Sequence, residues 1–294
     1  MIGEVTAVHL AETEGLYVRD IATGRIRTVV GPCAFLPDPT QVELVRRTLE
    51  PDTATRYGIT RSDPARAPAV TIPPSYAVLV TAKNRREVVK GPQVRILEHD
   101  EELGTLALST GTPKSDAVKL STCFLLIGGN KVSDSVKVRT ADHVELQVRL
   151  SYRVSYTSKS GVDDARWFNV NNYVALLCDH LGSLVRAAVR SVPVDKFHAS
   201  SAEVIRSTIL GEKKGDKRAG REFEENGMLV YDVEVLEVQI LDEEVQELLE
   251  GAQRNAIISE VGRKREQLRL LDAEATEAVN RGIYLTQAQS LEKE

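Results

Sequence analysis

One stretch of this 294-residue chain, residues 136–156, constrains the fold more than any other. From residue 144 to residue 156 every even position is apolar and every odd position is polar. Such alternation is typical of a long half-buried strand, because successive side chains point to opposite faces of a sheet. A register slip of one residue would expose the whole apolar set, so the register of this strand is strongly specified.

The polar residues 140–143 interrupt the alternation, and Val136 and Val138 resume it on their other side. This pattern predicts a hairpin whose first arm carries the two valines. Asp142 is suited to the turn because its short side chain can hydrogen-bond to nearby backbone groups. Asp142 and His143 are therefore predicted to be structural turn residues.

A second long strand is predicted at residues 228–240, with its apolar phase changing between Val235 and Leu236 through a bulge or an exchange of face. A shorter strand is expected at residues 120–127. Two amphipathic helices lie between the long strands. The first begins near Asn169 or Asn171 and ends near residue 191. The second opens with a capping box at residues 200–203 and stops at Gly211. These elements predict a mixed unit over residues 119–240.

The chain before this unit contains an internal repeat. Each copy reads as strand, tight turn, strand, a Gly-Pro pair and a further short strand, and the pairs are 60 residues apart. The predicted structural turn residues are Gly31 and Pro32 in the first copy and Gly91 and Pro92 in the second. Two small antiparallel β modules are expected, at residues 1–57 and 66–114. Residues 50–68 and 109–116 are interpreted as loops.

Residues 242–294 lack proline and predict a long helix capped by Asp242. Apolar positions spaced by about seven residues form a heptad seam, which Lys264 and Gly282 interrupt. The predicted oligomerisation residues on this seam are Val261, Leu268, Leu271, Ala275 and Ala278. The fold class expected for the whole chain is α+β: two β modules, a mixed unit and a C-terminal helix.

Composition argues against several classes of function. A net charge of −5 disfavours DNA binding, which needs a basic surface. Cys33, Cys123 and Cys178 are far apart and suit neither a disulfide framework nor a zinc site. We find no signal peptide, and the longest apolar run is far shorter than a membrane span.

No motif predicts a catalytic, cofactor-binding or metal-binding residue. The pair Asp142 and His143 is the most enzyme-like, but neighbours in a turn point apart and no nucleophile is evident. We therefore expect a protein that is not an enzyme and needs no cofactor.

Several segments resemble the major vault protein family. Residues 140–156, 197–206 and 226–230 are similar to the family's shoulder domain, which itself resembles the stomatin/prohibitin/flotillin (SPFH) fold. Residues 14–25 and 108–114 are similar to its last two β repeats. The resemblance covers almost the whole chain and follows the family's order of repeat, repeat, shoulder and cap helix.

This resemblance implies a cytoplasmic structural protein that assembles side by side with its own copies into a hollow ribonucleoprotein shell, the vault. The C-terminal helices would form the cap, and the interior leaves room for enclosed cargo. With two repeats and a short helix, the chain could build a complete shell, a ring or a cap-like bowl, or be a fragment of a longer protein. The alternatives are a membrane-associated SPFH scaffold, disfavoured because an N-terminal apolar hairpin is missing, and an enzyme that uses Asp142 and His143.

Overall fold

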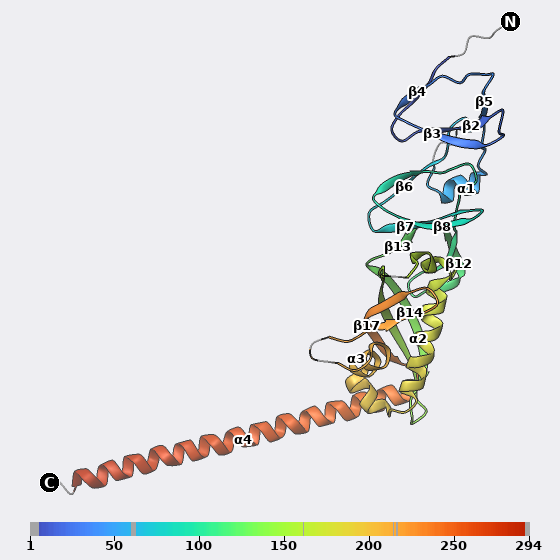
Figure 1. The fold of residues 1–294 in the computed structure, drawn as a ribbon. Helices are drawn as coiled ribbons and strands as arrows, with labels where there is room; N and C mark the ends of the chain where they lie inside the picture. Colours follow the sequence, from blue (N-terminus) through green and yellow to red (C-terminus); the bar gives the residue numbers. More distant parts are fainter. Residues whose placement is uncertain (1–5, 60–62, 161, 214, 216, 292–294) are drawn as a thin grey trace. The chain divides into compact units, whose positions relative to one another are not determined.

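The computed structural model describes residues 6–59, 63–160, 162–213, 215 and 217–291, with side chains up to residue 283. The fold combines helices, several small antiparallel sheets and a long C-terminal helix (Figure 1), which confirms the predicted α+β class. The chain divides into two compact units, Met1–Gln239 and Ile240–Glu294.

The first β module consists of five strands: β1 (Val8–Leu10), β2 (Gly15–Asp20), β3 (Ile26–Val30), β4 (Cys33–Phe35) and β5 (Val42–Val45). The central strand β2 pairs with β3 and β5, and β1 pairs with β4, all antiparallel. Its small core contains Leu10, Leu16 and Val18.

The second β module repeats this topology with β6 (Ala69–Ile72), β7 (Tyr76–Ala82), β8 (Arg85–Lys90), β9 (Gln93–Ile96) and β10 (Glu102–Leu103). Strand β7 pairs with β8 and β10, and β6 pairs with β9. The repeat seen in the sequence therefore corresponds to a repeat of strand pairing.

Both Gly-Pro pairs lie directly after the hairpin of their module, and both peptide bonds are cis. A Cβ atom at Gly31 would lie 2.0 Å from the carbonyl oxygen of Ala11, and one at Gly91 would lie 2.0 Å from that of Pro73. Glycine is required at both positions because the backbone passes so close.

Two segments that we interpreted as loops contain regular structure. Residues 50–68 include the helix α1 (Pro51–Arg56), which the first-turn residues Pro51 and Asp52 favour. Residues 109–116 belong to a hairpin of β11 (Leu106–Thr110) and β12 (Ser115–Thr122), which turns at the cis bond before Pro113. The strand predicted at residues 120–127 is accordingly divided between β12 and β13 (Leu125–Leu126), and β13 pairs with β7.

The mixed unit is built on a four-stranded sheet in the order β14 (Asn130–Arg139), β15 (Glu145–Tyr156), β17 (Met228–Ile240) and β16 (Arg221–Glu222). The predicted hairpin is confirmed, with Val136 opposite Val148 and Val138 opposite Leu146. The even-numbered side chains of β15 from Leu146 to Tyr156 are all buried, as the alternation predicted.

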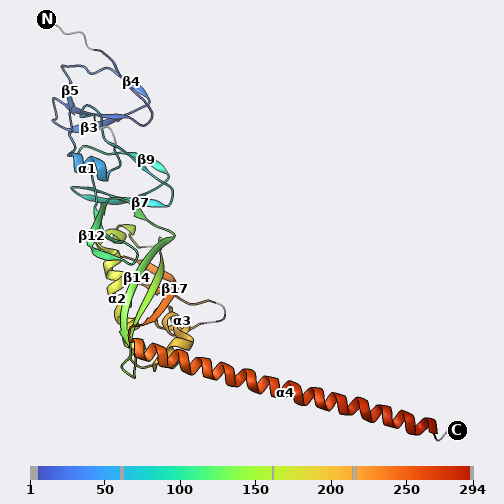
Figure 2. The ribbon, with the colours of Figure 1, turned by 180° about the vertical axis from the view of Figure 1, so that it is seen from behind.

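Helix α2 (Tyr173–Val189) packs against β14 and against α3 (Val194–Leu210), as Figures 1 and 2 show. A short 3-10 helix, η1 (Asp164–Phe168), precedes them. Helix α3 ends at Gly211 as predicted, but it begins six residues before Ser200. The burial of Val194 and Phe197 favours this earlier start. Ser200 has non-helical dihedral angles at a kink that joins two helical segments, so the predicted start at Ser200 corresponds to the second segment. The predicted capping box is not formed, because Ser200 Oγ donates to the carbonyl of Lys196 at 2.9 Å and Glu203 accepts from Arg218.

Strand β17 has the predicted bounds, and its burial changes phase between Val233 and Ile240, a range that includes the predicted position, but also changes phase earlier, before Val233. Met228, Val230 and Val233 are buried, whereas Tyr231 and Leu236 are exposed. The early change of phase lies at Val233, whose backbone groups form hydrogen bonds with side chains. Arg206 Nε donates to the Val233 carbonyl, and Asp232 Oδ1 accepts from the Val233 N–H.

The second unit is the single helix α4 (Glu243–Leu291), 49 residues long. Asp242 caps it, because its Oδ1 accepts from the N–H groups of Glu244 at 3.1 Å and Val245 at 3.3 Å. Within the described residues no helix combines the length and apolar character that a transmembrane span needs.

Candidate functional site

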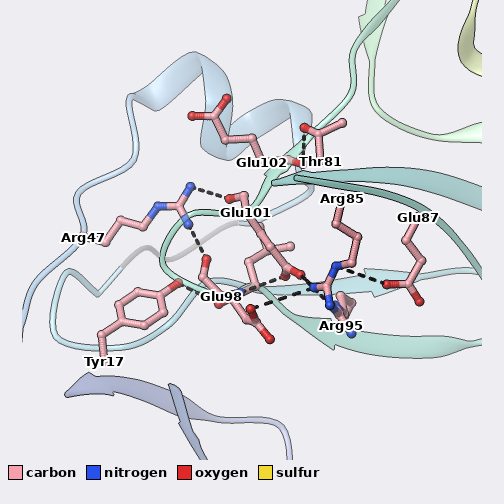
Figure 3. Close-up of polar contacts among 10 residues, drawn as sticks. Tyr17, Arg47, Thr81, Arg85, Glu87, Arg95, Glu98, Glu101 and Glu102 are labelled. Atoms are coloured by element: carbon pink, nitrogen blue, oxygen red, sulfur yellow. Dashed lines mark hydrogen bonds and ion pairs between the residues drawn. The ribbon is translucent and has the colours of Figure 1, made fainter. Parts of the chain in front are cut away.

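A polar joint links the two β modules (Figure 3). We define it as Tyr17 and Arg47 of the first module together with the loop of residues 97–101 in the second. The buried Tyr17 hydroxyl donates to the carbonyl of Leu97 at 2.7 Å. Arg47 donates to the carbonyls of Glu98 at 2.9 Å and Glu101 at 2.8 Å. Side chains of the first module thus satisfy three carbonyls of the loop at residues 97–101 in the second.

The Glu101 carboxylate braces this loop from inside the second module. It is fully buried and accepts from Arg85, from Arg95 at 2.7 Å and from the N–H of Glu98 at 2.9 Å (Figure 3). Desolvation raises the pKa of Glu101, but the hydrogen bonds from Glu98 and Arg95 outweigh it, so the pKa lies below its usual range. The joint therefore depends on an ionised carboxylate.

A second polar contact ties β8 to the mixed unit. Lys90 Nζ donates to Asp164 Oδ2 at 2.7 Å and lies 4.9 Å from the ring centroid of the buried Trp167. Trp167 packs in turn against Tyr156 of β15, with ring centroids 5.9 Å apart. Lys90 of β8 thus contacts η1, which lies far away in the sequence, through both an ion pair and a cation–π interaction.

Asp142 and His143 lie in the turn between β14 and β15. The Asp142 carboxylate accepts from Thr140 Oγ1 and from the N–H of Val194 at 3.1 Å, so it caps the first turn of α3. Desolvation raises the pKa of Asp142, but these two hydrogen bonds outweigh it and the pKa lies below its usual range. His143 has a φ of +67° and donates its N–H to the carbonyl of Thr140. This geometry makes the turn an anchor for α3.

Apolar side chains on β12 are exposed. Val118 is 66% exposed and Leu120 is 54% exposed, and both lie on one face of a strand that, among the described strands, pairs with β11 alone. A free strand edge beside an exposed apolar face is a ready surface for another chain.

The five residues of the predicted seam all lie on α4 and are exposed. Sequence reasoning missed that Ile257 falls on the same heptad positions as Leu271, fourteen residues before it, and is also exposed. The turn residues Gly31, Pro32, Gly91, Pro92, Asp142 and His143 belong to the other unit, in three separate turns.

Among the described residues, no cluster of three or more His, Cys, Asp or Glu side chains is arranged to hold a metal. Cys33 is exposed, whereas Cys123 and Cys178 are buried. Burial raises the pKa of the Cys123 thiol to about 12, so this thiol stays protonated at neutral pH.

Comparison with known proteins identifies the family. A family model described as the shoulder domain matches residues 128–242, which include the four-stranded sheet and both of its helices. The major vault protein of the ray Diplobatis ommata is 30% identical over 97% of this chain. The chain belongs to the major vault protein family. Major vault proteins of Danio rerio and Gallus gallus are 32% and 33% identical over 86% and 85% of this chain.

The chain spans about a third of the length of these major vault proteins: 37% of the ray protein and 32% of the fish and chicken proteins. Within that third, the shoulder domain contains the Asp142 turn and the sheet, and the two β modules with their joint precede it.

Proposed function

We propose that this chain is a non-catalytic structural subunit of a vault-like particle in the cytoplasm. Copies stand side by side, in contact through their β modules and shoulder domains, and pack their α4 helices together as a cap. The assembly is a ring or a hollow shell able to enclose cargo. In this proposal residues 1–57 and 66–114 are vault-type repeats, residues 119–240 the shoulder and residues 242–294 the cap-helix segment.

The exposed seam of α4 is the single observation that carries the proposal. A 49-residue helix that exposes Val261, Leu268 and Leu271 along one heptad seam leaves apolar surface in water. Covering that seam with the same seam of another copy removes it from water, at about 25 cal/mol for each Å² buried. The names of the relatives support a vault component and give no support to the membrane-scaffold alternative.

Light scattering and negative-stain electron microscopy of the full chain test the proposal. At micromolar concentration we expect a mass of many subunits and ring-shaped or bowl-shaped particles, because side-by-side contacts between identical chains close into rings when the rotation permits. A stable monomer under these conditions would contradict it. Particles that persist only with lipid present would favour the membrane scaffold instead.

A further inference from the structure

A basic pocket of about 200 Å³ lies between the end of α2 and the strand β14. The residues that line it are Lys137, Val138, Arg139, Glu145, Arg186 and Arg190. Four of these six are cationic and one is anionic. The shoulder domain thus carries a concentrated positive site although the whole chain has a net charge of −5.

The fold holds the two sides of the pocket in place. Arg186 and Arg190 are four residues apart near the end of α2, so both lie on one face of the helix. The segment after α2 is fixed to the turn after β14, because the N–H of Ala141 donates to the carbonyl of Val192 at 3.0 Å. The Asp142 cap on Val194 reinforces this contact. The backbones of the helix and of the edge strand are therefore fixed relative to each other, with Lys137 and Arg139 on the exposed face of β14 and the helix on its buried face.

Three cations of the pocket have no acidic partner. The carboxylate of Glu145 is engaged by Arg139. Among the ion pairs and side-chain hydrogen bonds of the described residues, none involves the side chain of Lys137, Arg186 or Arg190. Three other cations of the same sheet are paired: Lys131, Arg149 and Arg153 lie 3.7, 3.1 and 2.7 Å from a glutamate.

Structural stabilisation accounts for only part of this arrangement. Cations near the last turn of a helix interact favourably with its dipole, which explains Arg186 and Arg190. It does not explain Lys137 on a facing strand, and like charges four residues apart on a helix repel each other. Gly182 also leaves room for the Arg186 guanidinium, whose Nη1 would lie 3.4 Å from a Cβ at that position. The site is crowded with charge that a bound anion would neutralise.

We propose that this pocket binds the phosphate group of a small phosphorylated compound or of a phosphorylated lipid headgroup. A phosphate carries close to two negative charges and several acceptor oxygens, which match three unpaired cations better than a single carboxylate does. Two guanidinium groups can each offer a planar pair of donors to such oxygens. A single pocket of this size on an acidic chain does not fit a nucleic-acid backbone, which needs an extended basic stripe.

Calorimetric titration of the full chain with pyrophosphate is the first test, with sodium chloride at matched ionic strength as the blank. The double variant Arg186→Gln/Arg190→Gln should weaken binding at least about tenfold. The variant Arg186→Lys/Arg190→Lys keeps both positive charges but loses the planar pairs of guanidinium donors. Its affinity for pyrophosphate should therefore fall between those of the unchanged chain and the glutamine variant. Lys83→Gln/Arg86→Gln is the matched control, because it removes two exposed cations from the β7–β8 hairpin of the second module and should bind as the unchanged chain does.

Thermal unfolding of each variant shows whether the shoulder domain is still folded, so a loss of binding with an unchanged melting temperature supports the pocket.

Sedimentation with phosphatidylcholine vesicles that contain phosphatidylinositol 4-phosphate distinguishes a lipid headgroup from a small phosphorylated compound as the source of the phosphate. Binding to these vesicles alone, lost in the glutamine variant, would assign the headgroup. Absence of both kinds of binding, or binding that the glutamine variant retains, would overturn the proposal. A glutamine variant that only lowers the mass of the assembly would show that the pocket receives carboxylates of a neighbouring copy, which also overturns it.

Discussion

At the scale of single residues, the Glu101 carboxylate stabilises the loop of residues 97–101 that forms one side of the joint between the β modules. Replacing it with glutamine removes the charge that Arg85 and Arg95 share and leaves two cations with a weaker acceptor. We expect Glu101→Gln to lower the free energy of unfolding by about 1–3 kcal/mol, towards the low end because both arginines are partly exposed. The control is Glu87→Gln, an exposed carboxylate 3.9 Å from Arg85, which should cost under about 0.5 kcal/mol. Urea unfolding measures both, and equal costs would show that Glu101 has no special role.

The stability of the joint should also depend on pH. The pKa of Glu101 is lower in the folded chain than its ordinary value of 4.5, so its contribution is complete above that value. As the pH falls below 4.5 towards the folded pKa, the carboxylate takes up a proton and the contribution is lost. The difference in unfolding free energy between the unchanged chain and Glu101→Gln should shrink over that range. A difference that stays constant down to acid pH would contradict this assignment.

Asp142 should act as a cap for α3 and not as a catalytic group. Asp142→Ala removes the acceptor for the Val194 N–H and should cost about 0.5–2 kcal/mol of stability, as the loss of a helix cap does. Asp142→Asn keeps an acceptor oxygen and should restore most of that stability. Thermal unfolding compares the three, and an alanine variant as stable as the unchanged chain would exclude the cap.

The sequence predicted part of this residue-scale picture. The turn at Asp142 follows from local alternation and turn chemistry, which act over a few residues. The partner of Asp142 is 52 residues further on, and that of Tyr17 is 80 residues further on. No local pattern specifies such contacts, because they depend on how whole elements pack. In the sequence, Glu101 is likewise one of several neighbouring acidic residues. Its role becomes visible only in the fold, where Arg85 and Arg95 contact its carboxylate.

At the scale of elements, the seam of α4 offers a matched pair of substitutions. Leu270 and Leu271 are neighbours and are 59% and 60% exposed, but only Leu271 lies on the heptad seam. Burying a leucine between helices contributes about 1.5–3 kcal/mol, so Leu271→Glu should weaken helix association more than tenfold. Leu270→Glu should leave the assembly mass unchanged in light scattering. Equal effects, or no effect of either, would show that α4 packs through another face or not at all.

Elements with a regular period were predicted best, and irregular ones were predicted worst. The bounds of β17 and the end of α3 follow from alternation and from Gly211. The first segment of α3, before the kink at Ser200, and the early change of phase in β17 were missed, because the burial of Val194 and the contact of Arg206 with Val233 are not visible in local signals. The β11–β12 hairpin was missed since β12 is exposed and the short, half-buried β11 carries little apolar periodicity.

At the scale of the whole molecule, the α+β class and the order of the elements could be read from periodicity, but the assembly surfaces could not. Pattern shows that a side chain is apolar, and only the folded chain shows that Val118 and Leu120 remain uncovered beside a free strand edge. If copies stand side by side, this face of β12 is a surface in the first unit whose exposure a neighbour would relieve.

Substitutions on the two faces of β12 therefore test the lateral contact. Val118→Lys/Leu120→Lys places two charges on the apolar face and should prevent closed rings in negative-stain images, because a desolvated, unpaired charge is costly at an interface. Ala117→Lys/Ser121→Lys adds the same two charges to the opposite face of the same strand and should leave ring closure intact. Because α4 is unchanged in both variants, its helices can still associate, so the first variant should give small oligomers and not monomers. Rings that survive the first variant and fail in the second would place the neighbour on the other face of β12.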